Sequence, residues 1–264
     1  MNDLSPTSVA IISGGLGDIG SAVARELAAR FGAAVSLGDL RPESEARFLL
    51  GELRRGGTQA LYTQLDIADA DAAARWVSAT EAFFGVPADL IVPNAAQVTQ
   101  KSIRDMSPLE WERELSVNLS GSFYLAQAAS ARLLAAGLPG RIVFVGSWAA
   151  EAVHNGLPTY CVSKAGLRML MRCLALDLAP DGIFVNEVAP GFVDAGLSRQ
   201  VFDENPRRRE AATAQIPNRR LISAAQVARQ VAHLCNPETT HCIGSTLLMD
   251  GGLSLITPGY SHAD

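Results

Sequence analysis

The sequence predicts an α/β protein with one mostly parallel, seven-stranded, doubly wound sheet that has helices on both faces. The first observation is that short β-type segments alternate with helical patterns along the whole chain of 264 residues. Such alternation is typical of a parallel sheet whose strands are joined by crossover helices. The second is a glycine-rich turn, residues 13–20, between the first strand and the first helix. Because no repeat, linker or composition change interrupts the chain, we expect a single domain over residues 1–264.

The seven expected strands are short, apolar and bounded by turn residues. They cover residues 9–12, 33–37, 60–65, 88–92, 141–146, 184–188 and 246–249. A helix should follow the glycine-rich turn, because Ile19, Val23 and Leu27 recur every four residues. Other helices are expected over residues 42–55, 71–84, 107–134 with a bend near 118, 158–179 and 223–235. Capping boxes, Ser107 with Glu110 and Ser223 with Gln226, mark the starts of two of them. Residues 192–222 are polar, and we expect a mobile loop or short helices there, on the substrate side.

Composition argues against several classes of protein. Hydrophobic residues make up 48% of the chain and the net charge is −5, which disfavours binding to nucleic acid or to an anionic membrane. No apolar run approaches the roughly 18 residues of a membrane span, and the polar N-terminus has no signal-peptide pattern. The four Cys and four His show neither a disulfide framework nor metal-ligand spacing, so we expect no metal and a cytoplasmic location.

The glycine-rich turn favours a dinucleotide site of the Rossmann type. Glycines let the backbone approach a pyrophosphate, and the N-terminus of the next helix supplies amide donors. Asp39 follows the second strand, about twenty residues further on, where an acidic side chain can bind the ribose hydroxyls of an adenosine. A tight turn with a solvated acid would explain either feature alone, but the spacing and strand-end position of Asp39 favour the ribose.

Tyr160 and Lys164 are four residues apart on an expected helix, so both side chains should lie on one face, one turn apart. An ammonium beside a phenol favours the phenolate, so we expect the pKa of Tyr160 to fall from about 10 and the phenol to be a usable general acid or base. Ser147 closes the fifth strand. Alone, a Tyr-x-x-x-Lys pair is a weak signal. The pair becomes informative because other strands also end in residues suited to a ligand site: Asp39, Asp66, Asn94 and Pro190.

On these residues the chain resembles the short-chain dehydrogenase/reductase family, over residues 11–252. The most specific part is the set Asn118, Ser147, Tyr160 and Lys164, in the order and close to the spacing of the family's catalytic residues. The resemblance implies that Tyr160 is the acid/base and that Ser147 holds the substrate oxygen. It also implies that Lys164 lowers the pKa of Tyr160 and binds the nicotinamide ribose, and that Asn118 holds a water in a proton relay.

The same resemblance implies a set of cofactor contacts. Asp66 and Ile67 match the pair beside the adenine, and Asn94 and Ala95 match the element beside the adenosine ribose. The segment from Pro190 would flank the nicotinamide. The residues expected to bind the cofactor are Ser13, Gly14, Gly17, Asp18, Ile19, Gly20, Asp39, Asp66, Ile67, Asn94, Ala95, Tyr160, Lys164, Pro190, Gly191 and Val193.

Four positions depart from the family pattern. Asp18 replaces a glycine of the cofactor turn, so its side chain should point outwards or cap the helix. Pro93 and Ala96 replace the Asn and Gly that usually flank the pair Asn94 and Ala95. Ala195 stands where a threonine often contacts the cofactor's carboxamide.

We therefore expect an NAD-dependent oxidoreductase that interconverts a secondary alcohol (a sugar, a polyol or a similar hydroxy compound) and its ketone. Trp148, His154 and Phe192, with Ser147 and Tyr160, should line the substrate side. One alternative is an NADPH-dependent 3-oxoacyl (carrier protein) reductase, in which the arginines at 207–209, 219 and 220 would face an acidic carrier; a solvated charge run explains them as well. An alternative of another class is a non-catalytic dinucleotide-binding regulator, against which the intact Ser, Tyr and Lys argue.

Asp39 favours NAD over NADP, because a carboxylate repels a 2′-phosphate. Positions 17 and 40, where a basic residue would rescue NADP, are Gly and Leu. Arg41 is the exception, and we expect it to be solvated or stacked on the adenine.

The helix that carries Tyr160 predicts self-association. Its apolar residues surround most of its circumference, whereas a surface helix of a monomer has a wide polar face. We expect a homodimer or homotetramer, which the resemblance also implies. These apolar residues are Val162, Leu167, Met169, Leu170, Met171, Leu174, Leu176 and Leu178.

Overall fold

The computed structural model describes residues 8–196, 199, 203 and 206–256, and its centre is a seven-stranded sheet. The strand order is β3-β2-β1-β4-β5-β6-β7, and every neighbouring pair is parallel. The order reverses between β1 and β4, which is the switch point of a doubly wound sheet. The strands are β1 (Val9–Ser13), β2 (Ala34–Asp39), β3 (Ala60–Gln64), β4 (Leu90–Val92), β5 (Gly140–Val145), β6 (Ile183–Pro190) and β7 (Thr246–Met249).

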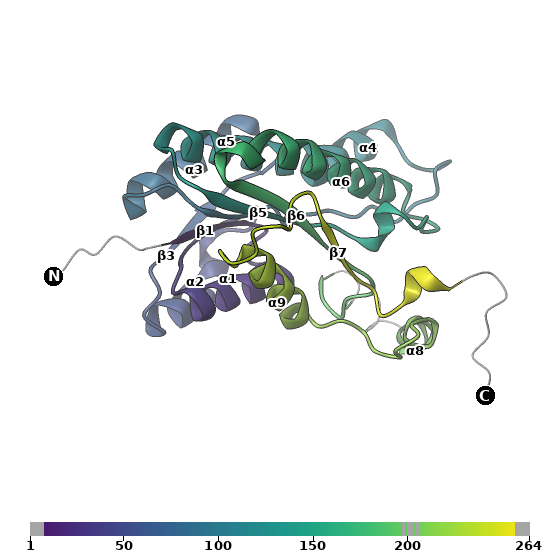
Figure 1. Cartoon of the computed structure of the whole chain (residues 1–264). Coiled ribbons are helices and arrows are strands. Elements are labelled where there is room, and N and C mark those ends of the chain that lie inside the picture. The colour runs from purple at the N-terminus through teal and green to yellow at the C-terminus, as the bar shows by residue number, and fades with distance from the viewer. Residues whose placement is uncertain (1–7, 197–198, 200–202, 204–205, 257–264) are drawn as a thin grey trace.

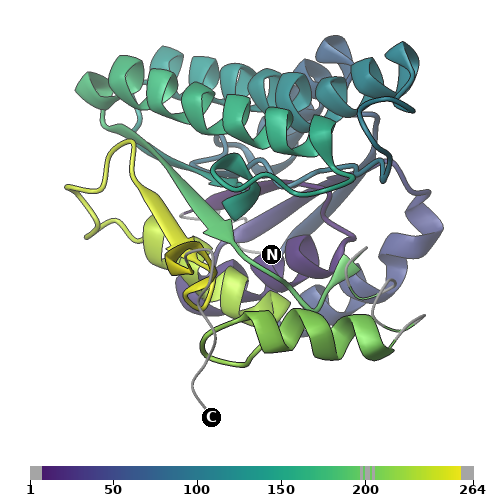
Figure 2. The ribbon, with the colours of Figure 1, turned by 90° about the vertical axis from the view of Figure 1, so that its right-hand side faces the viewer.

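Helices cover both faces of the sheet, so the molecule has three layers (Figure 1). One layer holds α1 (Asp18–Phe31), α2 (Glu43–Arg55) and α9 (Ala224–Cys235). The other holds α3 (Ala70–Phe84), α4 (Pro108–Leu115), α5 (Gly121–Ala136) and α6 (Pro158–Leu178). Figure 2 shows α8 (Pro206–Gln215) on the same side of the sheet as α9. In the described part of the chain, no helix combines the length and the hydrophobicity that a bilayer span needs.

Each face of the sheet has its own apolar core. Successive side chains of a strand point to opposite faces, so Ile12 packs in the core with α1, α2 and α9, whereas Ile11 packs in the core with α3, α5 and α6. Both side chains are fully buried. Because the central strands are packed from both sides, the residues at their carboxyl ends have fixed positions.

The predicted strands and helices are present, with small shifts at their ends. β6, for example, continues through Pro190 instead of ending at 188. The expected bend after α4 is one turn of π-helix, Ser116–Ser120, a feature that often marks functional sites. Both predicted capping boxes, at Ser107 and Ser223, are formed. Within the described part of residues 192–222, the chain forms the short helix α8.

The turn between β1 and α1 brings backbone segments into close contact. Gly14 has a φ of 62°, and a Cβ at this position would lie 2.9 Å from the Cα of Ala95. A Cβ on Gly20, in the first turn of α1, would lie 2.2 Å from the carbonyl oxygen of Gly14. Both positions therefore need a residue without a side chain.

We predict that Gly20→Ala destabilises the protein by about 1–3 kcal/mol, the usual cost of overpacking. The matched control is Gly51→Ala in α2, where a Cβ meets no atom within 4 Å. Alanine is favoured over glycine in a helix by roughly 0.5–1 kcal/mol, so the control should be as stable as the native protein or more stable. Denaturant unfolding measures both variants, and equal effects would contradict the close contact at Gly20.

Candidate active site

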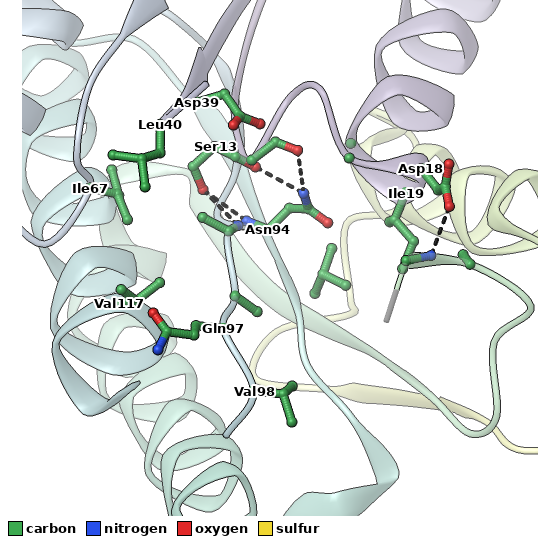
Figure 3. Close-up of a pocket in the computed structure, with 18 of the residues that line it drawn as sticks. Ser13, Asp18, Ile19, Asp39, Leu40, Ile67, Asn94, Gln97, Val98 and Val117 are labelled. Carbon is green, nitrogen blue, oxygen red and sulfur yellow. Dashed lines mark hydrogen bonds between the residues drawn. The ribbon is translucent and has the colours of Figure 1, made fainter. Parts of the chain in front are cut away.

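A cavity of about 560 Å³ lies at the carboxyl ends of the strands, around the switch point between β1 and β4. This volume is in the usual range of ligand pockets. Every residue that the sequence predicts as a cofactor contact lines the cavity, and so does Ser147. Figure 3 shows the part of the wall that comes from the ends of β1, β2 and β4.

Ser13 and Asn94 join the ends of β1 and β4 (Figure 3). The hydroxyl of Ser13 accepts hydrogen bonds from the backbone amides of Asn94 and Ala95, at 3.0 and 3.1 Å. The side-chain amide of Asn94 donates to the carbonyls of Ser13 and Gly14, at 2.9 and 3.1 Å. Asn94 therefore holds the shape of the glycine-rich turn. Pro93 keeps a backbone role as well, because its carbonyl accepts from the amide of Val145 at 3.1 Å.

The carboxylate of Asp39 is held at the end of β2. Its Oδ2 accepts from the amide of Leu16 at 3.0 Å, and its Oδ1 accepts from the amide and Nε of Arg41, both at 3.2 Å. The expectation of a solvated Arg41 holds only in part: the side chain is 43% exposed, but its guanidinium pairs with Asp39. The two charges thus compensate each other at the wall of the cavity.

Two residues of β3 fix the loop that carries Arg41. The hydroxyl of Tyr62 donates to the carbonyl of Arg41, and Nε2 of Gln64 donates to the carbonyl of Leu40 at 3.2 Å. Burial, with the nearby charge of Asp39, raises the pKa of Tyr62 to about 12, so the phenol is a donor at neutral pH. Sequence reasoning missed Tyr62 and Gln64, because no local pattern gives the partner of a side chain on a strand.

Asp66 follows β3 and pairs with Arg113 of α4, at 2.7 Å. It also accepts from the amide of Ala68 at 3.0 Å. Burial raises the pKa of Asp66, but these hydrogen bonds outweigh burial and bring the pKa below its usual value. Arg113 lines the cavity and was not predicted, since it lies 47 residues further along the chain.

Asp18 does not cap α1, and this alternative of the prediction is wrong. Gly17 is the N-cap, and the carboxylate of Asp18 accepts from the backbone amide of Gly196 at 2.7 Å. Arg199 lies 3.4 Å from the same oxygen. Asp18 therefore points away from the turn and joins it to the segment after β6 (Figure 3).

Ser147, Tyr160 and Lys164 come together where β5 ends beside α6. Ser147 is buried and lies two residues after the end of β5. Tyr160 and Lys164 are one turn apart on α6, with Nζ of Lys164 5.6 Å from the centre of the Tyr160 ring. Nζ of Lys164 donates to the carbonyl of Val145 at 2.9 Å, which ties the helix to the strand.

The predicted fall in the pKa of Tyr160 is wrong. Burial raises the pKa of Tyr160, and a hydrogen bond with Ser147 opposes this rise only in part. Burial also lowers the pKa of Lys164 to about 8, against the attraction of Glu187. The reason is that burial disfavours the charged form of both groups, while the ammonium is directed at the carbonyl of Val145.

Asn118 lies in the π-helical turn and holds the segment after β4. Its Oδ1 accepts from the amide of Gln97 at 2.7 Å, and its Nδ2 donates to the carbonyl of Gln97 at 2.9 Å and to Oγ of Ser163 at 3.1 Å. The side chain is fully buried and does not line the cavity. Because both amide hydrogens are used, this side chain positions the cavity wall at Gln97.

The three residues predicted for the substrate side form an aromatic cluster. The ring of Trp148 meets His154 and Phe192 edge to face, with centres 4.4 and 5.4 Å apart. None of the three lines the 560 Å³ cavity. Nε2 of His154 is buried without a hydrogen-bond partner among the described residues, and burial lowers the pKa of His154. Their contact with substrate stays a prediction.

Comparison with known proteins gives relatives that match almost the whole chain. The family model described as enoyl-(acyl carrier protein) reductase matches residues 15–254. The 3-oxoacyl-[acyl-carrier-protein] reductase FabG of Escherichia coli (strain K12) is 32% identical over 248 residues, 94% of this chain and 98% of that protein. The cis-4-hydroxycyclohexanecarboxylate dehydrogenase of Sinomonas cyclohexanicum is 32% identical over 261 residues, 97% of this chain and 100% of that protein.

Solved structures with the same fold also match almost the whole chain. The crystal structure of gox2181 has a TM-score of 0.89 at 28% identity and covers 95% of this chain and 97% of its own. A proposed 2-deoxy-d-gluconate 3-dehydrogenase from Agrobacterium tumefaciens, solved with bound NADP, has a TM-score of 0.84 at 27% identity and covers 97% and 100%. The chain belongs to the short-chain dehydrogenase/reductase family, whose members are NAD(P)-dependent oxidoreductases.

The cavity fits a nicotinamide dinucleotide. Gly17 begins α1 without a side-chain acceptor, so the first amides of the helix remain for a pyrophosphate. The missing side chains of Gly14 and Gly20 let the backbone close into a tight turn at this point. Asp39 and Lys164 line the same cavity and offer an acceptor and a donor for ribose hydroxyls.

Proposed function

We propose that the protein is an NAD-dependent oxidoreductase that interconverts a secondary alcohol, such as a sugar, a polyol or a similar hydroxy compound, and its ketone. The observation that carries the proposal is the meeting of Ser147, Tyr160 and Lys164 in a dinucleotide-sized cavity that also contains Asp39. A bound nicotinamide supplies the hydride chemistry. The chain itself then has to hold one substrate oxygen and move one proton.

The hydroxyls of Ser147 and Tyr160 perform these two tasks. Two donors directed at an oxygen where negative charge develops stabilise that charge. Because burial keeps the pKa of Tyr160 raised, the phenol holds its proton at neutral pH and gives it to the oxygen when a ketone is reduced. In the opposite direction the phenolate form of Tyr160 takes a proton from the alcohol. The ammonium of Lys164, on the same face of the helix, favours this phenolate by its charge.

The second candidate is an NADPH-dependent 3-oxoacyl (carrier protein) reductase. It is favoured by the resemblance to FabG and by the NADP in a structural neighbour. Arg207 and Arg208 on α8 are exposed and available to an acidic carrier, whereas Arg209 is paired with Asp194. A non-catalytic regulator is the least supported class, because all three reactive side chains are retained around one cavity.

The NAD preference rests on the adenosine end of the cavity. The carboxylate of Asp39 can accept from both ribose hydroxyls, and a 2′-phosphate would meet its negative charge. Arg41 is the nearby cation, but it is already paired with Asp39. Using Arg41 for a phosphate would leave this carboxylate uncompensated at the cavity wall.

Self-association is supported by one face of α6. Leu167 and Met171 are buried in the core, but Val162, Met169 and Leu176 are 49%, 57% and 82% exposed. These three are seven residues apart and form one stripe on the outer side of the helix. We expect this apolar stripe to be covered by a second copy of the chain, in a homodimer or homotetramer.

A cytoplasmic location is consistent with the thiols. Cys161, Cys173, Cys235 and Cys242 are all free. Free thiols are typical of reducing compartments.

Tyr160→Phe should lower kcat by about 10²–10⁴-fold, the usual contribution of a general acid–base group. NAD affinity should change little, because only the phenolic oxygen is removed. Tyr124→Phe on α5, outside the cavity, is the matched control and should keep the native rate. Steady-state kinetics over a panel of alcohols and ketones measures both variants. Native turnover by Tyr160→Phe would reject Tyr160 as the acid/base.

The native enzyme should prefer NAD to NADP by at least tenfold in kcat/KM, about 1.4 kcal/mol. Asp39→Ala should relax this preference, and Arg41→Met added to it should remove the NADP activity gained. Asp71→Ala, which removes an exposed carboxylate at the start of α3, is the control for lost charge. A tenfold preference of the native enzyme for NADP would promote the 3-oxoacyl reductase alternative.

Light scattering at micromolar concentration should give a multiple of the 27.9 kDa chain mass. Met169→Glu with Leu176→Glu should shift the mass towards the monomer, because two charges would be buried in the expected interface. Phe48→Glu, on the opposite layer at α2 and 75% exposed, should leave the mass unchanged. A monomeric native protein would refute the proposed association.

A further inference from the structure

A buried ion pair lies directly behind Ser147, away from the cavity. Nε of Arg168 donates to Oε2 of Glu187 at 2.7 Å, and its NH2 group lies 3.5 Å from Oε1. The side chain of Arg168 is 6% exposed and that of Glu187 is fully buried. Thr246 of β7 donates to the same carboxylate at 2.7 Å. The pair therefore connects α6, β6 and β7.

The pair also contacts the backbone of Ser147. The NH2 group of Arg168 donates to the carbonyl oxygen of Ser147 at 3.2 Å. On the other side of this residue, the amide of Gly146 donates to the carbonyl of Val188 at 2.8 Å. Arg168 also pairs with Glu151, which is 62% exposed, just beyond the short turn after Ser147. The serine is thus held at its carbonyl by the guanidinium.

Gly146 is the residue that makes room for the carboxylate. A Cβ at this position would lie 1.8 Å from Oε1 of Glu187. The missing side chain lets the charged group lie against the backbone at the end of β5, one residue before Ser147. The support therefore depends on a matched set of three residues: Gly146, Arg168 and Glu187.

A stabilising role alone does not explain this arrangement. Replacing a buried ion pair by apolar residues of similar volume is often neutral or stabilising, because two charges no longer need to be desolvated. The pair instead fixes the position of α6 relative to the end of β5. Tyr160, Lys164 and Arg168 follow each other at intervals of four residues on α6, so they share one face of the helix. Arg168 links that face to the strand end that carries Ser147.

We propose that Arg168 and Glu187 are positioning residues that set the distance of the Ser147 hydroxyl from Tyr160. The inference rests on the proposed function, in which these two hydroxyls must reach one substrate oxygen. Misplacing a reacting group by about 1 Å can cost roughly a hundredfold in rate. The pair does not line the cavity itself; its contact with the reacting residues is the hydrogen bond from Arg168 to the carbonyl of Ser147, while the charge of Glu187 also favours the ammonium of Lys164.

A double-mutant cycle with Ser147 tests the proposal. Arg168→Met combined with Glu187→Met removes both charges and leaves neither one unpaired. In the native background this paired change should lower kcat about tenfold to a hundredfold, with the KM for NAD changed less than about twofold. In the Ser147→Ala background the same change should alter kcat by less than about twofold, because the group to be positioned is already absent.

Two further variants complete the experiment. Arg168→Lys keeps the charge but loses the fork that reaches both Glu187 and Ser147, so it should give an intermediate loss of kcat. If the paired variant does not fold by thermal unfolding, Arg168→Lys carries the same cycle. Arg132→Met with Glu81→Met removes an ion pair between α5 and α3, outside the cavity, and should leave kcat unchanged.

The possible results separate the two hypotheses. An equal loss of kcat in the native and Ser147→Ala backgrounds, or a native kcat for the paired variant, overturns the positioning role while the proposed function stands. Native turnover by Ser147→Ala, or no turnover by the unmodified enzyme on any alcohol or ketone of the panel, rejects the proposed function itself.

Discussion

The reversal of strand order between β1 and β4 determines where this protein can bind a ligand. On either side of the reversal, the connecting helices cross to opposite faces of the sheet, so the strand ends between them are left uncovered. The cavity lies at this point, and the ends of β1, β2, β4, β5 and β6 all contribute to its wall. Because the strands are packed from both faces, the positions of the polar residues that follow them are fixed by the sheet.

Desolvation is the second constraint, and it acts on the groups where the chemistry is expected. Burial raises the pKa of Tyr160 and lowers that of Lys164, so both groups are biased towards their neutral forms. Glu187 opposes the shift of Lys164 by its charge. The buried carboxylate of Glu187 thus helps Lys164 on α6 to remain an ammonium. No sequence pattern predicted that these two residues lie near each other.

The sequence was sufficient wherever a local pattern carries the information. Periodicity predicted the strands and helices, capping boxes predicted the starts of α4 and α9, and the ends of the strands predicted the residues that line the cavity. Contacts between residues far apart in the chain had no such signal, which is why Arg113 and Tyr62 were missed. The pKa of Tyr160 was predicted with the wrong sign for the same reason, because spacing along a helix gives neighbours but does not give burial.

The two ends of the cavity are built differently, and this difference bears on how the family varies. Asp39, 10% exposed at the end of β2, pairs with Arg41, which is 43% exposed on the following loop, and β3 holds that loop. Ser147 and Lys164 are instead fixed to buried groups of β5 and α6. Substitutions at the exposed Arg41 would leave the core unchanged, whereas a change at the reacting end would disturb buried groups. Relatives that share 32% of this sequence carry the names of different substrates, as expected when a conserved fold positions the reacting groups and exposed loops select the substrate.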